Sequence, residues 1–283
     1  MLIQLASLFT AILAVVAAPA KNDSPAKVQN IPVESVPALT AQSVFLIDLS
    51  QGEILLQKNT DQPYPIASIT KLATALVLLD KNPHWPTPVT FTAADKRNGG
   101  IPYLIPGEQI TVLEAWNLML IGSSNDAAQL LARVFFDDDE QFLTALNSKM
   151  QELGFSHTRF ADPTGLDAQN ISTAREVAAL TRLALTHPPI REAVRKRKIT
   201  ITPLGKAPRL VYSTNWLLGS FNEATDVFGG KTGHIEESGY NLVFSAGRGG
   251  HELLGVVLGA ESNEARFKEM KELLDWGFNI VQE

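Results

Sequence analysis

The 283-residue sequence contains no cysteine. That absence excludes thiol catalysis, thiolate-bound zinc, iron–sulfur clusters and disulfide bonds. The five histidines show none of the spacings typical of a zinc site. We therefore expect no metal and no cofactor. A chain of this length can bury a sizeable core without a disulfide or metal cross-link.

The sequence also has fewer basic residues than acidic ones. The sequence has 24 Lys and Arg residues against 30 Asp and Glu residues, a net charge of −6. This balance argues against nucleic acid as a partner, because nucleic-acid-binding domains carry a strong basic footprint. The local exception is 191–198, where five residues are Lys or Arg. A solvated surface is the simpler interpretation of this run, and contact with an anionic polymer is the alternative.

Long apolar runs are absent after the first twenty residues, so we expect no later segment to cross a membrane. Residues 2–18 carry no charge, and Ala18-Pro-Ala20 has the small-x-small pattern of a signal-peptidase site. We predict a cleaved signal peptide at 1–20, a polar linker at 21–37 and an exported folded domain at 38–283. An uncleaved anchor or a buried helix is the alternative for the first segment, although its apolar run is shorter than the roughly 20 residues that span a bilayer.

Strand patterns lie at both ends of the folded domain, with helix patterns between them. Two β-hairpins are expected, one at 43–56 and one at 240–258. Helices are expected at 71–79, 111–121, 125–135, 140–153, 173–187 and 267–281. Capping boxes begin the second and the fifth of these helices. This order predicts an α+β or mixed α/β fold, with one antiparallel sheet built from both chain ends and a helical insertion.

The first candidate motif is Ser68-Ile-Thr-Lys71, at the start of the apolar helix. Residues three apart share a helix face, so the Lys71 ammonium can reach the Ser68 hydroxyl. Burial disfavours the charged form of lysine and lowers its pKa, which would place a base beside a nucleophile. The motif also occurs by chance, and Ser68 is equally compatible with a simple helix cap.

Two further segments carry polar side chains between predicted elements. Ser123-Ser-Asn125 joins two helices and can present a hydroxyl and an amide to a cleft, although helix capping explains it equally well. Gly229-Gly-Lys-Thr-Gly233 is not a phosphate loop, because Thr225 stands where that motif needs its first glycine and a strand follows. On an edge strand, it would offer a cation, a hydroxyl and a position without a side chain.

In this order and spacing, the three motifs resemble those of the serine D-alanyl-D-alanine peptidases, the low-molecular-mass penicillin-binding proteins. The middle element is Ser-Ser-Asn, the variant expected of the peptidase branch. The resemblance covers residues 41–259 and includes the segments 65–72, 124–128, 162–166, 172–175, 230–235 and 239–242. It implies a β-lactamase/transpeptidase-like α/β (α+β) fold, and it makes 38–283 a D,D-peptidase catalytic domain.

The resemblance also implies three catalytic roles. Ser68 would attack the carbonyl of a D-Ala–D-Ala bond and become acylated. Lys71 would take the serine proton. Ser123 would relay a proton to the leaving amine.

The remaining site residues are implied to bind the substrate. Asn125 would hold the substrate's amide, and Lys231 with Thr232 would bind its carboxylate. Gly233 would leave space for that carboxylate. The backbone N–H of His234, together with that of the nucleophile, would form the oxyanion hole.

The implied substrates are peptidoglycan stem peptides that end in D-Ala or are cross-linked through it, in the periplasm or outside the cytoplasm, with β-lactams as inhibitors. A β-lactamase is the alternative enzyme, but residues 155–171 contain no glutamate to activate a deacylating water. A non-catalytic penicillin-binding sensor is the alternative from another class. Only 50 residues follow Gly233, so we expect no further domain, no stable membrane anchor and a soluble endopeptidase-type enzyme.

Overall fold

The computed structural model describes residues 36–281. The predicted signal peptide and almost all of the predicted linker lie outside the described residues. Within 36–281, none of the helices combines the length and the apolar character that a membrane crossing requires.

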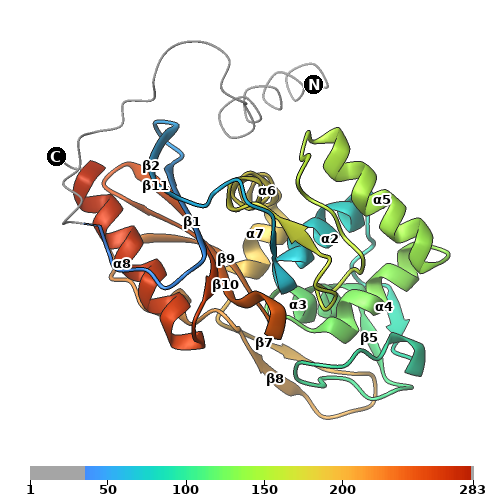
Figure 1. Ribbon diagram of the computed structural model, residues 1–283. Helices are drawn as coiled ribbons and strands as arrows, with labels where there is room; N and C mark the ends of the chain where they lie inside the picture. The colour runs from blue at the N-terminus through green and yellow to red at the C-terminus, as the bar shows by residue number, and fades with distance from the viewer. Residues whose placement is uncertain (1–35, 282–283) are drawn as a thin grey trace, which may run out of the picture.

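A five-stranded antiparallel sheet joins the two ends of the chain (Figure 1), as the sequence predicts. Its strands are β1 (Ser43–Asp48), β2 (Glu53–Lys58), β9 (Asp226–Ile235), β10 (Gly239–Arg248) and β11 (His251–Ala260). The spatial order is β2-β1-β11-β10-β9, so β9 forms one edge. Both predicted hairpins are present, and the Lys-Thr-Gly segment lies on the edge strand.

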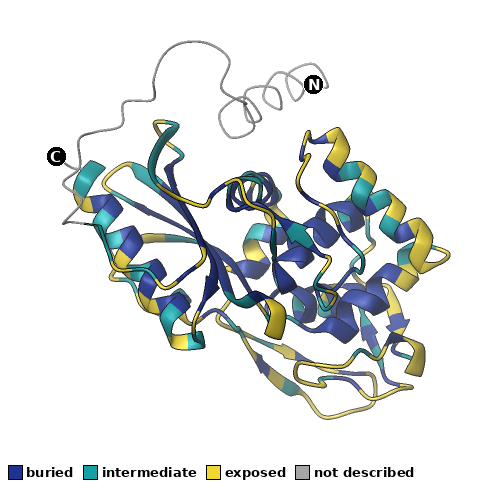
Figure 2. Ribbon diagram, in the orientation of Figure 1, coloured by how far each residue is buried: buried dark blue, intermediate teal, exposed yellow. Residues whose placement is uncertain are grey.

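Helices cover both faces of this sheet (Figure 1). Helix α8 (Asn263–Val281) packs on one face, against β10 and β11. Its apolar stripe is buried there, as predicted from the spacing of Phe267, Met270 and Leu273. Helix α6 (Ala174–Thr186) lies against β11 and β1 on the other face. The inner strand β1 is therefore covered on both sides (Figure 2), and all six of its residues are buried, with the apolar run Val44–Ile47 at its centre.

The helical insertion surrounds a buried central helix, α2 (Thr70–Leu79). Around it lie α3 (Val112–Leu120), α4 (Asn125–Phe135) and α5 (Asp139–Glu152). These bounds agree with the predicted helices to within one or two residues. Nine of the ten residues of α2 are buried, because neighbouring helices cover every side of it.

Several short elements connect the sheet and the helical insertion. The paired strands are β3 (Tyr64–Pro65) with β6 (Ile171–Ser172), β4 (Pro88–Thr90) with β5 (Gln109–Thr111), and β7 (Lys198–Ile201) with β8 (Arg209–Tyr212). The 3₁₀ turns are η2 (Ala67–Ile69), η3 (Ala93–Asp95), η4 (Trp216–Gly219) and η5 (Glu236–Ser238). Helix α6 ends before Pro188 as predicted, but a short helix that was not predicted, α7 (Pro188–Val194), begins at that proline. Proline is favoured at a first helical position because its missing N–H has no partner to lose there.

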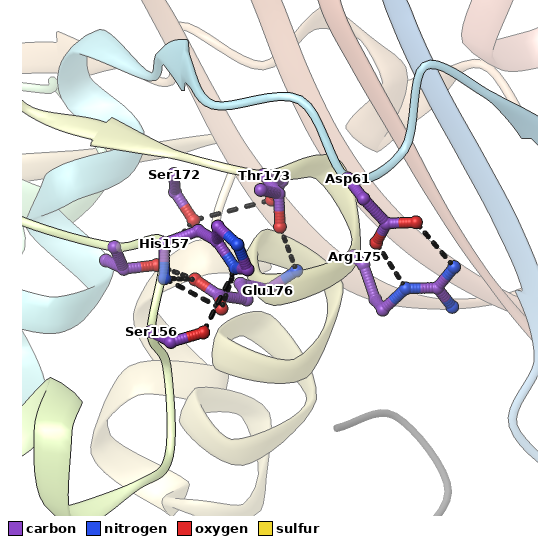
Figure 3. Close-up of polar contacts among 8 residues, drawn as sticks. Asp61, Ser156, His157, Ser172, Thr173, Arg175 and Glu176 are labelled. Atoms are coloured by element: carbon purple, nitrogen blue, oxygen red, sulfur yellow. Dashed lines mark hydrogen bonds and ion pairs between the residues drawn. The ribbon is translucent and has the colours of Figure 1, made fainter. Parts of the chain in front are cut away.

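The start of α6 holds the loop that precedes it (Figure 3). Thr173 caps the helix by accepting a hydrogen bond from the Glu176 backbone N–H at 3.1 Å. The predicted capping box is only half formed, because the Glu176 carboxylate accepts from the His157 backbone N–H at 3.1 Å and from the Thr158 hydroxyl at 2.5 Å instead. Glu176 therefore holds residues 157–158 against the start of α6. Residues 162–165, further along the same segment, reach the candidate site.

Candidate active site

Ser68 lies in the 3₁₀ turn η2, directly before helix α2. Its side chain is half-buried, and its Oγ lies 2.7 Å from the Nζ of Lys71, one turn further along. The preceding residue, Ala67, has a φ of +49°, which is uncommon for a residue with a Cβ. Such strained backbone positions cluster at functional sites, where they hold a side chain in one orientation.

Lys71 has no exposed surface. Its Nζ lies 2.7 Å from the Asn125 Oδ1 and 2.6 Å from the Thr164 carbonyl oxygen. Burial lowers the Lys71 pKa to about 7, and the negative charge of Asp162 only partly opposes this. A substantial fraction of Lys71 is therefore neutral near pH 7 and can accept the Ser68 proton.

The carbonyl that faces Lys71 belongs to a tight turn at residues 162–165. The Asp162 carboxylate accepts hydrogen bonds from the backbone N–H groups of Thr164, at 2.5 Å, and Gly165, at 2.8 Å. The Asn170 side chain binds both the N–H and the carbonyl of Asp162. Gly165 has a φ of +85°, and a Cβ there would lie 2.0 Å from the Ala67 carbonyl oxygen. The turn is thus held by its own side chains, and it packs directly against the turn that carries the nucleophile.

The second hydroxyl of the site is that of Ser123, between α3 and α4. Ser123 has a φ of +56°, and its Oγ accepts a hydrogen bond from Lys231 Nζ at 2.7 Å. Lys231 is buried on β9 and also donates to the Thr232 carbonyl at 3.0 Å. Burial is the main cause that lowers the Lys231 pKa, and the positive charges of Lys71 and Arg266 add to it. A carboxylate bound beside Lys231 would favour its charged form.

Asn125 is nearly buried at the first turn of α4. Its Oδ1 faces Lys71, and its Nδ2 donates to the Gly99 carbonyl at 3.0 Å. Both ends of the amide are therefore engaged within the protein. This geometry makes Asn125 an anchor for the lysine in addition to its implied role toward the substrate's amide.

Strand β9 runs directly past the nucleophile. A Cβ at Gly233 would lie 2.6 Å from the Ile66 carbonyl and 3.2 Å from the Ser68 backbone nitrogen. The glycine therefore has a packing reason, since it lets the strand approach η2. Thr232 lies on the same stretch, and its Oγ1 is 2.5 Å from the Oγ1 of Thr214. His234 is exposed, and its ring stacks on Tyr240 at a centroid distance of 4.1 Å.

Arg266 is a site residue that the sequence analysis missed. It lies on α8, is 7% exposed, and donates from Nη1 to the Gly233 carbonyl at 2.9 Å and the Asn241 carbonyl at 3.2 Å. Burial lowers its pKa to about 10, so it stays charged at neutral pH. The sequence signal that could have identified Arg266 is its position, because it is a charged residue directly beside Phe267 in the apolar stripe of the helix.

The structure thus brings the eight predicted site residues together from η2 and the first turn of α2, the junction between α3 and α4, and β9. They supply a hydroxyl beside a partly neutral lysine, a second hydroxyl beside a cation, and a strand edge for a peptide. No group of three or more His, Asp or Glu side chains in the described part of the chain could hold a metal ion. The arrangement is suited to acyl transfer through a serine.

The pKa of Lys71 predicts the pH dependence of acylation. The neutral amine is the active form, so the rate constant for acylation by penicillin should rise with pH below about 7 and level off above it. Stopped-flow or fluorescent-penicillin kinetics would measure this profile. A rate that does not change between roughly pH 5 and 8 would contradict a neutral Lys71 as the base.

Comparison with known proteins supports this interpretation of the site. Residues 30–262 match the Peptidase S11 family, described as D-alanyl-D-alanine carboxypeptidase. The Escherichia coli carboxypeptidase DacC is 33% identical over 259 residues, which cover 87% of this chain and 63% of DacC. The D-alanyl-D-alanine endopeptidase of Pseudomonas aeruginosa is 30% identical, over 96% of this chain and 88% of that protein. The chain thus spans less than two thirds of the length of DacC.

Solved structures share the fold. The Streptomyces K15 DD-transpeptidase superposes with a TM-score of 0.80 at 27% identity, over 86% of this chain and 99% of that one. Penicillin-binding protein D2 of Listeria monocytogenes, in its cefotaxime-bound form, has a TM-score of 0.75 at 31% identity, over 86% of this chain and 98% of that one. The transpeptidase-like fold predicted from the sequence is confirmed, and the chain belongs to the Peptidase S11 family of D-alanyl-D-alanine carboxypeptidases.

Proposed function

We propose that the protein is a serine-type D-Ala–D-Ala peptidase that acts on peptidoglycan stem peptides and is acylated by β-lactams at Ser68. The observation that carries this proposal is the 2.7 Å contact between the Ser68 Oγ and the Nζ of a fully buried Lys71. A lysine desolvated in this way is a general base at neutral pH, and the hydroxyl beside it is the nucleophile that it activates.

The reaction proceeds in two acyl-transfer steps. Lys71 takes the Ser68 proton as the Oγ attacks the carbonyl carbon of the penultimate D-Ala. The backbone N–H groups of Ser68 and His234 stabilise the oxyanion, and loss of one such donor typically lowers the rate by about 10²–10³-fold. Ser123, held by Lys231, passes a proton to the leaving amine. Water then hydrolyses the Ser68 ester and returns the free enzyme.

Substrate binding uses the strand edge and the cations behind it. Lys231 and Thr232 bind the carboxylate of the leaving residue, next to Ser123. Asn125 binds the substrate's amide while its Oδ1 keeps Lys71 in place. Arg266 supports this edge from behind by holding the Gly233 carbonyl.

A β-lactamase is the less favoured alternative. Rapid hydrolysis of an acyl-enzyme in class A β-lactamases uses a glutamate and a water. The segment that faces Lys71 offers a backbone carbonyl, that of Thr164, and its carboxylate, Asp162, is used within the turn. A non-catalytic penicillin sensor is less favoured because two hydroxyl–lysine pairs, Ser68 with Lys71 and Ser123 with Lys231, are each in hydrogen-bond contact, which supports a reacting site.

We further propose that the enzyme is exported and cleaves D,D cross-links in addition to, or in preference to, terminal D-Ala. The D-alanyl-D-alanine endopeptidases of Pseudomonas aeruginosa and Haemophilus influenzae are matched over 88% and 70% of their lengths, more than the carboxypeptidase DacC at 63%. The acyl-transfer chemistry is the same for both substrates, and only the leaving amine differs.

Digestion of purified muropeptides tests this preference. Cross-linked dimers and pentapeptide monomers are incubated side by side with the enzyme, and the products are separated by liquid chromatography. We expect dimers to be converted to monomers. Release of D-Ala alone, with intact dimers, would contradict the endopeptidase activity and leave the Ser68 mechanism standing.

A further inference from the structure

A cavity of about 550 Å³ lies beside the candidate active site, between the β7–β8 hairpin and the turn η4. Arg197, Lys198 and Tyr212 line it from the hairpin side, and Asn215 and Trp216 line it from the turn. None of these residues belongs to the predicted catalytic or substrate-binding set. The cavity is therefore distinct from the residues assigned to the reacting part of the substrate.

The cavity is connected to the site through a single segment of chain. Thr214 lies between Ser213 and Asn215, both of which line the cavity. The Thr214 hydroxyl is 2.5 Å from the hydroxyl of Thr232, which is proposed to bind the carboxylate of the leaving residue. Through Thr214, the lining of the cavity is therefore in direct contact with a side chain of the proposed carboxylate site.

The charges around the cavity favour an anion. Arg197 and Lys198 are both exposed, and within residues 36–281 no carboxylate oxygen lies within ion-pair distance of either cation. They are the last two residues of the basic run at 191–198. Elsewhere in the hairpin, Arg209 is paired with Glu108, so the two cations at the cavity differ from their neighbour in having no such partner.

A buried side-chain amide also belongs to the lining of the cavity. Asn215 is 5% exposed, and its Oδ1 accepts a hydrogen bond from the Leu217 backbone N–H at 3.1 Å. This bond fixes the orientation of the amide, and the Nδ2 has no hydrogen-bond partner among the described residues. An unpaired buried donor destabilises a protein, so such groups commonly have an acceptor in the working state.

Aromatic rings complete the wall. Trp216 is 56% exposed, and one face of its ring stacks on Phe267 at 5.0 Å. Tyr212, on the hairpin, also lines the cavity and is 63% exposed. Large exposed aromatic side chains that are held in place are well suited to bind the aliphatic part of a polar ligand.

We propose that this cavity binds the leaving half of a cross-linked peptide. In such a substrate, the leaving amine belongs to a side chain of the neighbouring peptide, and the residue with that side chain also carries a carboxylate. The inference rests on the proposed D,D-peptidase function. The carboxylate next to the scissile bond takes the Lys231–Thr232 position, as the carboxylate of D-Ala would. The remainder of the leaving peptide enters the cavity, where its carboxylates meet Arg197 and Lys198 and its aliphatic part lies against Trp216. Monomeric pentapeptide leaves the cavity empty.

Equilibrium binding in a Ser68→Ala background tests the proposal without relying on turnover. The probes are a purified cross-linked muropeptide dimer and a pentapeptide with the same acyl half, titrated by calorimetry. The double variant Arg197→Gln/Lys198→Gln should weaken dimer binding about tenfold and leave pentapeptide binding within about twofold. Arg195→Gln/Lys196→Gln removes the same charge from the same basic run without touching the cavity, and it should change neither affinity.

The cavity proposal is overturned if the Ser68→Ala protein binds dimer and pentapeptide with equal affinity. It is also overturned if the Arg197→Gln/Lys198→Gln variant loses the same factor of affinity for both ligands. A loss of dimer affinity in the control variant as large as in the Arg197→Gln/Lys198→Gln variant would overturn it as well. Failure of the proposed function has a separate signature. If the Ser68→Ala protein still cleaves either substrate, Ser68 is not the nucleophile, whatever the binding ratios are.

Discussion

Replacing Lys71 with alanine is expected to lower the rate of penicillin acylation by about 10²–10⁴-fold, the usual contribution of a positioned general base. The lysine is the only titratable side chain within hydrogen-bond distance of the Ser68 hydroxyl among the described residues. Without it, Ser68 has no group to take its proton at neutral pH. The measurement is the pseudo-first-order rate of labelling by a fluorescent penicillin, followed on a gel.

The matched control is Lys81→Ala, which removes an exposed lysine just beyond the end of the same helix. This variant should label at the rate of the unaltered protein. Thermal unfolding of both variants shows whether they are folded, because Lys71→Ala also leaves the Asn125 and Thr164 oxygens without their donor. A folded Lys71→Ala protein that is labelled within about threefold of the normal rate would show that another residue takes the proton.

The second large effect is on stability and comes from Gly165→Ala. The added Cβ would lie 2.0 Å from the Ala67 carbonyl oxygen and 2.8 Å from the Ser68 backbone nitrogen, at a φ of +85°. Neither contact can be relieved by a side-chain rotation, because both atoms belong to the backbone. Overpacking and a disfavoured backbone conformation together should lower the free energy of unfolding by about 4 kcal/mol. For a domain of this size, the melting temperature should fall by roughly 10 °C.

Gly250→Ala separates the two causes. Gly250 has a φ of +87°, almost the same as Gly165, but nothing lies within 4 Å of an added Cβ. This variant should lose only the conformational part, about 1 kcal/mol, and should keep its normal acylation rate. Differential scanning fluorimetry of the two variants gives the comparison. Equal decreases in melting temperature would show that the close approach of the two turns contributes nothing.

The contacts between Ser68 and Lys71 could be predicted because they are local. A spacing of three residues fixes the shared helix face, and the apolar sequence of 71–79 indicates the burial that lowers the lysine pKa. The long-range partners could not be predicted in the same way. Thr164 offers Lys71 a backbone carbonyl from 93 positions away, and any residue type can supply a carbonyl. Only the fold decides which one does.

The sheet was predictable because β1, β10 and β11 are strongly apolar and are bounded by glycine turns. The β7–β8 hairpin was not, because each of its strands has only four residues and the first begins inside the basic run at 191–198, which was interpreted as a solvated surface. Arg266 was missed for a related reason. Helical periodicity marks the buried face of α8, but it does not indicate that a charged residue on that face reaches two carbonyls of the sheet.

The most direct test of the central claim is to identify the residue that penicillin acylates. The purified protein is labelled to completion and digested with a protease, and the modified peptide is sequenced by mass spectrometry. We expect one adduct per molecule, on Ser68, whose hydroxyl contacts the buried Lys71 three residues later. An adduct on Ser123 or Ser124, or no adduct on a folded protein, would contradict it.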